Sequence, residues 1–172
     1  ATSRGQARAG GEERGSYRLK KFQGTAKAAA LTRITIQADQ GLNGGARRGE
    51  IIGRGNCLAR RLQDTPANKM RPRDMVREAR TIARDSPRIT AKIHDEKAMA
   101  ALKMGSLLSV SRGSREPAYL IHPVYKPAGK VRRRICLVGT GLTFDTCGVR
   151  LQPPLRAGAM QDYMHGCPAG VA

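Results

Sequence analysis

Hydrophobic and polar positions follow helical spacing in some parts of this chain and strand-like spacing in others. Apolar residues recur at helical spacing from about Arg47 to Leu62, and again from Pro72 to about Arg84. Proline suits the first turn of a helix, and the residue before a proline leaves the α region. Pro72 is therefore expected to open the second helix, while Asp64-Thr65-Pro66 ends the first. A shorter helix is predicted over Asp95–Met104.

Runs of β-branched and apolar residues, separated by loops with glycine and proline, predict strands. The predicted strands are Leu31–Gln37, Arg88–His94, Ser106–Ser111, Tyr119–Tyr125 and Arg134–Val138. Because strands and helices interleave, the expected fold class is α/β, with a partial mixed sheet flanked by helices. Residues 1–46 are expected to form an extended basic N-terminal arm with one short strand, and residues 47–172 a single α/β domain.

The charge balance narrows the range of functions. The 172 residues include 32 Lys and Arg against 13 Asp and Glu, a formal net charge of +19. Such a charge repels itself unless a polyanion neutralises it, and nucleic acid is the usual polyanion. No apolar run approaches the roughly 20 residues that cross a bilayer, so no membrane span is expected.

Basic residues gather in the arm, on the second predicted helix, and before the last predicted strand. On the helix, four arginines recur at spacings of 4, 3 and 4, which places them in one stripe. The predicted RNA-binding residues are Arg18, Lys20, Lys21, Arg73, Arg77, Arg80, Arg84, Lys130, Arg132, Arg133 and Arg134. Beside the arm cluster, Tyr17 is expected either to stack on a base or to anchor the arm on a neighbouring surface.

Cysteines and histidines give no metal site. The four cysteines lack CxxC pairing and are read as reduced thiols, which suits the cytosol or the mitochondrial matrix. The three histidines show no i, i+4 pair, and no cofactor is expected. The first residues carry Arg and Ser and no acid before Glu12, which is compatible with the remnant of an organellar presequence. The expected location is the mitochondrial matrix, with the cytoplasm as the alternative.

Val138–Gly148 reads V-G-T-G-L-T-F-D-T-C-G and resembles the active-site loop of the leucine (cytosol) aminopeptidase family, K-G-L-T-F-D-S-G-G. Asn56–Lys69 is similar to the family's A-R-D-L-x-N-T-P-x-N segment, and Gly105–Ser114 to its G-A-L-L-A-V-x-x-G-S segment. Met160–Gly166 follows in the family's order. The resemblance covers roughly residues 47–171 and implies a fold like the start of the family's catalytic domain.

The resemblance also implies a two-metal site that activates a water for attack on a peptide carbonyl. The family's metal-binding lysine corresponds here to Thr140, its next lysine to Gln152, and an aspartate ligand to Tyr163. Asp145 is the only family ligand retained in its own place. The family's N-T-D-A-E-G-R segment, which supplies further carboxylates, has no counterpart in this chain. The expectation is an inactive pseudoenzyme that holds no metal.

Charge and resemblance together lead to three hypotheses. The main one is a non-catalytic structural subunit of a ribonucleoprotein particle, above all a mitochondrial ribosome. Its partners would be ribosomal RNA and neighbouring ribosomal proteins, with no small-molecule substrate. The alternative is a divergent or truncated metal-dependent leucyl aminopeptidase. The second alternative is a structural subunit of a protein assembly without RNA.

Overall fold

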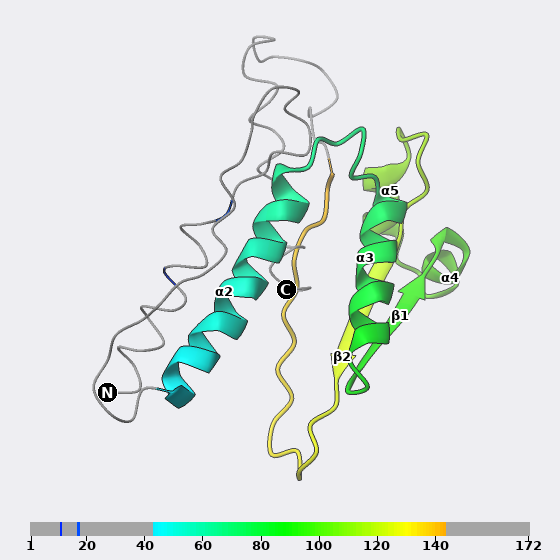
Figure 1. The fold of residues 1–172 in the computed structure, drawn as a ribbon. Helices are drawn as coiled ribbons and strands as arrows, with labels where there is room; N and C mark the ends of the chain where they lie inside the picture. Colours follow the sequence, from blue (N-terminus) through cyan, green and yellow to red (C-terminus); the bar gives the residue numbers. More distant parts are fainter. Residues whose placement is uncertain (1–10, 12–16, 18–42, 144–172) are drawn as a thin grey trace, which may run out of the picture. The chain divides into compact units, whose positions relative to one another are not determined.

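The computed structural model describes Gly11, Tyr17 and residues 43–143 (Figure 1). The chain divides into two compact units, residues 1–65 with Ala172 and residues 66–171. The predicted strand Leu31–Gln37 lies outside the described residues. The predicted boundary at residue 46 stays a prediction.

In the first unit, the described residues form helix α2, Asn43–Asp64. It contains five glycines, each of which costs a helix about 1 kcal/mol relative to alanine. Local contacts offset part of this cost. Arg54 forms an ion pair with Glu50 one turn earlier, and Thr65 Oγ1 donates to the Arg61 carbonyl at 2.6 Å. The helix predicted over Arg47–Leu62 is confirmed, and it begins one turn earlier.

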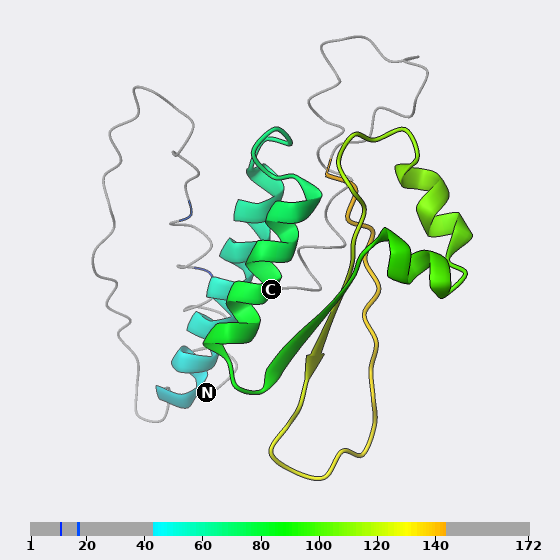
Figure 2. The ribbon, with the colours of Figure 1, turned by 90° about the vertical axis from the view of Figure 1, so that its right-hand side faces the viewer.

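The described residues of the second unit, 66–143, form three helices and two strands, and α3 lies along one side of the two-stranded sheet (Figure 2). In chain order they are α3 (Pro72–Asp85), β1 (Ile89–His94), α4 (Glu96–Ala101), α5 (Gly105–Ser111) and β2 (Leu120–Tyr125). Helix α3 lies against both strands, while α4 contacts β1 and α5. The α/β class with a partial sheet flanked by helices is confirmed.

Helix α3 begins as its sequence predicts. Pro72 occupies the first turn, and the Asp74 carboxylate accepts a hydrogen bond from the Arg71 backbone N–H at 2.9 Å. Met75, Val76 and Ala79 share one face of the helix and are buried. This apolar face provides most of the core that the unit's described residues form, together with Met70 and Met99.

Strands β1 and β2 pair in antiparallel register, with Ile89 opposite Tyr125 and Ala91 opposite Pro123. The Lys126 N–H donates to the Arg88 carbonyl at 2.8 Å, which fixes the alternation of the ladder. Hydrogen-bonded and non-hydrogen-bonded pairs alternate along an antiparallel ladder, so Ala91 and Pro123 form a non-hydrogen-bonded pair. The nitrogen of Pro123 therefore points away from β1, toward the outer edge of β2. The outer edge of β2 therefore lacks one N–H donor.

Two predicted strands are wrong. Ser106–Ser111 lies within α5, where the serine hydroxyls donate back to carbonyls three residues earlier, Ser109 to Ser106 at 2.8 Å and Ser111 to Leu108 at 3.1 Å. The serines therefore suit a helix despite their strand-like spacing. Arg134–Val138 is extended but belongs to no strand. Because Pro123 has no N–H donor, the outer edge of β2 is a weaker pairing partner for residues 134–138.

Two residues after the end of α4, the chain has a residue in the left-handed conformation. Lys103 has φ 56° and donates its N–H to the Ala100 carbonyl at 2.9 Å. A non-glycine residue in the left-handed region costs about 1–2 kcal/mol of folding free energy. Replacing it with glycine removes this cost, but glycine also raises the entropy of the unfolded chain, which offsets part of the gain. We expect Lys103→Gly to raise the free energy of unfolding, measured by urea denaturation, by about 0.5–1 kcal/mol.

The matched control for this substitution is Lys97→Gly, inside the same helix with right-handed backbone. It should lower the free energy of unfolding by about 1 kcal/mol. Equal losses for the two variants would contradict the role assigned to the φ of Lys103.

Candidate functional site

The loop that resembles the aminopeptidase active-site loop is described only at its head. Residues 138–142 run without helix or strand, and Thr140 is exposed to solvent. Leu142 and Thr143 are half-buried. Asp145, Gln152 and Tyr163 lie outside the described residues. The structure therefore places one of the exchanged family positions and leaves the others as sequence assignments.

The described residues alone do not supply a dinuclear metal site. Within residues 43–143, no group of three or more His, Cys, Asp or Glu side chains could hold a metal ion. Thr140 offers a neutral hydroxyl where the family resemblance implies a lysine nitrogen, and metals that activate water take carboxylate, imidazole or amine ligands in preference.

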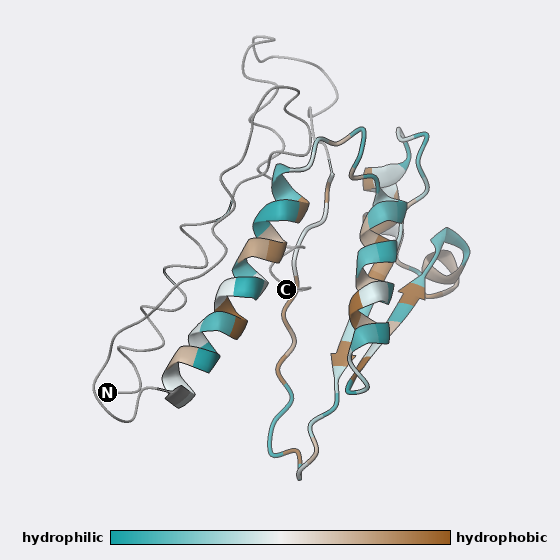
Figure 3. Ribbon diagram, in the orientation of Figure 1, coloured by the Kyte–Doolittle hydropathy of each residue, from teal (hydrophilic) through white to brown (hydrophobic). Residues whose placement is uncertain are grey.

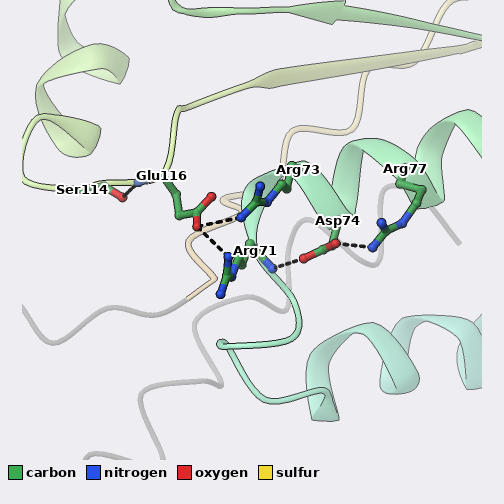
Figure 4. A network of polar contacts seen from close by, with 6 residues as sticks. All are labelled: Arg71, Arg73, Asp74, Arg77, Ser114 and Glu116. Carbon is green, nitrogen blue, oxygen red and sulfur yellow. Dashed lines mark hydrogen bonds and ion pairs between the residues drawn. The ribbon is translucent and has the colours of Figure 1, made fainter.

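The α3 arginine stripe has the spacing predicted, but carboxylates neutralise much of it (Figure 4). Arg73 forms an ion pair with Glu116 at 3.2 Å, and Arg77 forms one with Asp74. Arg84 Nε lies 3.2 Å from an oxygen of Asp85. Three of the four predicted contact residues are thus already paired within their own unit.

Glu116 joins α3 to the loop before β2. One of its carboxylate oxygens lies 3.1 Å from Arg71 Nη1 and 3.2 Å from Arg73 Nη2, so a single acid bridges two cations (Figure 4). Its own N–H donates to Ser114 Oγ at 3.0 Å, which orients the loop. Sequence reasoning missed this residue, because it lies 43 positions from Arg73 and no local spacing relates them.

The third basic cluster lies on the extended segment after β2. Lys130, Arg132, Arg133 and Arg134 are all exposed. Within residues 43–143, no ion pair involves any of them. This cluster therefore differs from the α3 stripe, whose charges are largely matched.

Tyr17 contacts α2 within the first unit. The Arg60 guanidinium carbon lies 4.4 Å from the centroid of the Tyr17 ring, a cation–π geometry. The pKa of Tyr17 is raised to about 12, chiefly by burial and also by the Asp64 carboxylate. Of the two roles predicted for Tyr17, the contact supports anchoring on a neighbouring surface. Arg18, Lys20 and Lys21 lie outside the described residues.

None of the helices that the structure describes is long and apolar enough to cross a bilayer.

Known proteins share both the sequence and the fold. A family model described as the catalytic domain of the cytosol aminopeptidase family matches residues 57–172. A probable cytosol aminopeptidase of Aquifex aeolicus is 34% identical over 139 residues, which cover 81% of this chain and 28% of the relative. Another, of Saccharophagus degradans, is 36% identical over 166 residues, which cover 93% of this chain and 32% of the relative.

A solved structure agrees with these matches. The bottromycin maturation enzyme BotP, in complex with Mn, superimposes with a TM-score of 0.76 at 26% identity, over 97% of this chain and 34% of that one. The chain thus spans about a third of the length of the relatives and of the structure that it matches.

The prediction of ribosomal RNA and ribosomal proteins as partners is wrong. The matching family model and the curated relatives are aminopeptidases, and none of them points to a ribosomal, ribonucleoprotein or mitochondrial assignment. The physical reason is that a net positive charge favours acidic partners in general and gives no positions, so it does not single out ribosomal RNA. The cellular compartment stays a prediction.

The sequence resemblance, by contrast, is confirmed in the segments that carried it. The family model begins at Cys57, inside the segment Asn56–Lys69, and extends through the loop Gly141–Asp145 to the last residue. The same region carries the described elements from α3 to β2. This chain belongs to the cytosol aminopeptidase family.

Proposed function

We propose that this chain is part of a divergent, metal-dependent aminopeptidase that releases N-terminal residues from peptides. The observation that carries the proposal is the match of the family's catalytic domain to residues 57–172, which include the loop Gly141–Asp145. Curated relatives named probable cytosol aminopeptidase support it. Because the chain spans about a third of those relatives, the activity is proposed for the protein to which this domain contributes.

A second candidate function is a non-catalytic member of the same family. One specific observation favours it: the position of the family's metal-binding lysine is the exposed Thr140. Gln152 and Tyr163 replace two further family positions at the level of sequence. In this alternative the domain keeps the scaffold of a peptidase and contributes no hydrolysis.

A hybrid enzyme separates the two candidates. The stretch of the Aquifex aeolicus relative that corresponds to residues 57–172 is replaced by those residues, and hydrolysis of leucine 4-nitroanilide is measured with added Mn²⁺. We expect slow, Mn²⁺-dependent hydrolysis, at least about 100-fold below the parent, because a hydroxyl replaces an amine ligand at Thr140, and Gln152 and Tyr163 replace a family lysine and an aspartate ligand. Thr140→Lys in the hybrid should raise the rate by at least about tenfold.

The control is Thr140→Met in the same hybrid, which gives a side chain of similar length without an amine. It should leave the rate unchanged. A hybrid with the circular dichroism spectrum and elution volume of the parent, but with background hydrolysis before and after Thr140→Lys, would favour the non-catalytic candidate.

A further inference from the structure

The loop between α5 and β2, residues 112–119, is held by polar contacts and not by an apolar core. Residues 112–115 and Pro117 are exposed, and none of residues 112–119 is buried. Figure 3 shows hydrophilic, teal colour along the loop that follows α5, and brown, hydrophobic bands on β1 and β2. At the start of the loop, the Ser114 N–H donates to the Ser111 carbonyl at 2.9 Å. We call residues 112–119 the strap.

Two contacts tie the strap to distant parts of its own unit. At the start of α3, Arg71 Nη1 and Arg73 Nη2 lie 3.1 Å and 3.2 Å from the same carboxylate oxygen of Glu116. Two positions further along the strap, the Ala118 N–H donates to Glu96 Oε1, in the first turn of α4, at 2.9 Å. A carboxylate is the acceptor in both contacts. The attachment of the strap to α3 and α4 therefore depends on charge.

Salt acts on the strap and on the chain as a whole in opposite directions. The side chains of Glu116, Arg71 and Arg73 are 31%, 41% and 57% exposed, so dissolved ions reach the bridge and screen its attraction. For the whole chain, with a formal net charge of +19, the same screening reduces self-repulsion and favours the compact state. A segment that loses protection as salt is added thus differs from its surroundings.

We propose that the strap is a salt-controlled conformational device, which opens locally when the Glu116 bridge is lost. Exposed ion pairs contribute little free energy, and segments with few buried apolar contacts open well before a domain unfolds. The buried face of α3 lies against β1 and β2 and includes no residue of the strap, so these elements stay folded when it opens. Opening leaves Arg71 and Arg73 without their shared acid and gives solvent access to the strap N–H groups. This inference goes beyond the proposed function, because opening requires no hydrolysis.

Amide hydrogen exchange of the full 172-residue chain tests this proposal. The strap amides of Glu116 and Ala118 are each compared with a free peptide of residues 112–119, which corrects for the direct effect of salt on exchange. The reference amides are those of Val76 and Ala79, inside α3. When NaCl is raised from about 20 mM to about 500 mM, we expect the strap amides to exchange at least about threefold faster. The α3 amides should exchange at the same rate or more slowly.

Variants assign this response to the bridge. Glu116→Gln keeps the shape of the side chain and removes its charge, so at low salt its strap should exchange at least about threefold faster, with little further response to salt. Arg71→Gln combined with Arg73→Gln should have the same effect, and adding Glu116→Gln to this pair should change nothing more, because all three remove one contact. The matched control is Asp85→Asn, which removes a carboxylate that pairs with Arg84 in the same unit. It should leave strap exchange unchanged.

Three results would overturn the proposal. Strap amides that respond to salt as the α3 amides do would show that the Glu116 bridge does not hold the loop. Equal effects of Glu116→Gln and Asp85→Asn would assign the change to net charge alone. Loss of protection in α3 together with the strap in Glu116→Gln, accompanied by loss of the helical circular dichroism signal, would show that the bridge supports the whole unit and not a local opening. The salt response of the unmodified chain stands whether or not this variant folds.

Discussion

Ala79→Asp is expected to unfold the second unit. Ala79 is 3% exposed on the face of α3 that also buries Met75 and Val76 against the sheet. A carboxylate at this position loses its hydration, and the residues one turn away on its own helix face, Met75 and Ala83, are apolar. The added atoms also have to enter a packed interface. The combined loss exceeds about 4 kcal/mol, a large part of the 5–15 kcal/mol that holds a typical domain together.

Far-UV circular dichroism and urea denaturation measure this effect. The matched control is Arg80→Asp, which introduces the same residue at the next, exposed position of α3. We expect the control to change the free energy of unfolding by less than about 1 kcal/mol. If both variants kept cooperative unfolding at the same urea concentration, the core assigned to α3 would be incorrect.

Met99→Ala is expected to give the second large effect. Met99 is fully buried in α4, which contacts both β1 and α5, and its carbonyl accepts a hydrogen bond from the Met104 N–H at 3.0 Å. Truncation removes the apolar side chain and leaves a cavity that the short helix cannot fill. We expect a loss of about 2–5 kcal/mol in the free energy of unfolding, measured by urea denaturation.

Two further variants separate burial from helix effects. Met99→Leu conserves the volume and should cost less than about 1.5 kcal/mol. Leu102→Ala shortens a side chain that is 54% exposed at the end of the same helix, and should cost less than about 1 kcal/mol. A loss at Leu102 as large as that at Met99 would show that α4, and not its buried side chain, is the sensitive feature.

The elements that sequence predicted correctly are those with local signals. Pro72, Asp74 and the apolar face of α3 lie within one helix, and Asp95 caps α4 by accepting a hydrogen bond from the Ala98 N–H at 2.8 Å. The strand predicted over Ser106–Ser111 was wrong because the apolar and polar positions of six residues fit a helical period as well as a strand period. The strand predicted over Arg134–Val138 was wrong for a non-local reason. A strand pairs with an edge that offers free N–H donors, and Pro123 removes one donor from the outer edge of β2.

The candidate site was predictable to a similar extent. The loop Gly141–Asp145 was found from its own residues, and the family match confirms the resemblance. The spacing of the α3 arginines was also correct. Their pairing was not, because Glu116 reaches Arg71 and Arg73 from a distant part of the chain. A net charge gives no positions, so it could not distinguish paired arginines from free ones.

The bridge at Glu116 has a consequence for ion-exchange behaviour. Anions from the buffer collect around free cationic side chains, and a polyanion that binds there releases these anions, which raises the entropy of the system. Arg71 and Arg73 share an internal carboxylate, and Arg77 has its own, so these positions release little chloride when a polyanion approaches. On a sulfonate resin, the chain should therefore elute at a lower salt concentration than its 32 Lys and Arg side chains alone would indicate, because internal acids already pair with part of its basic surface.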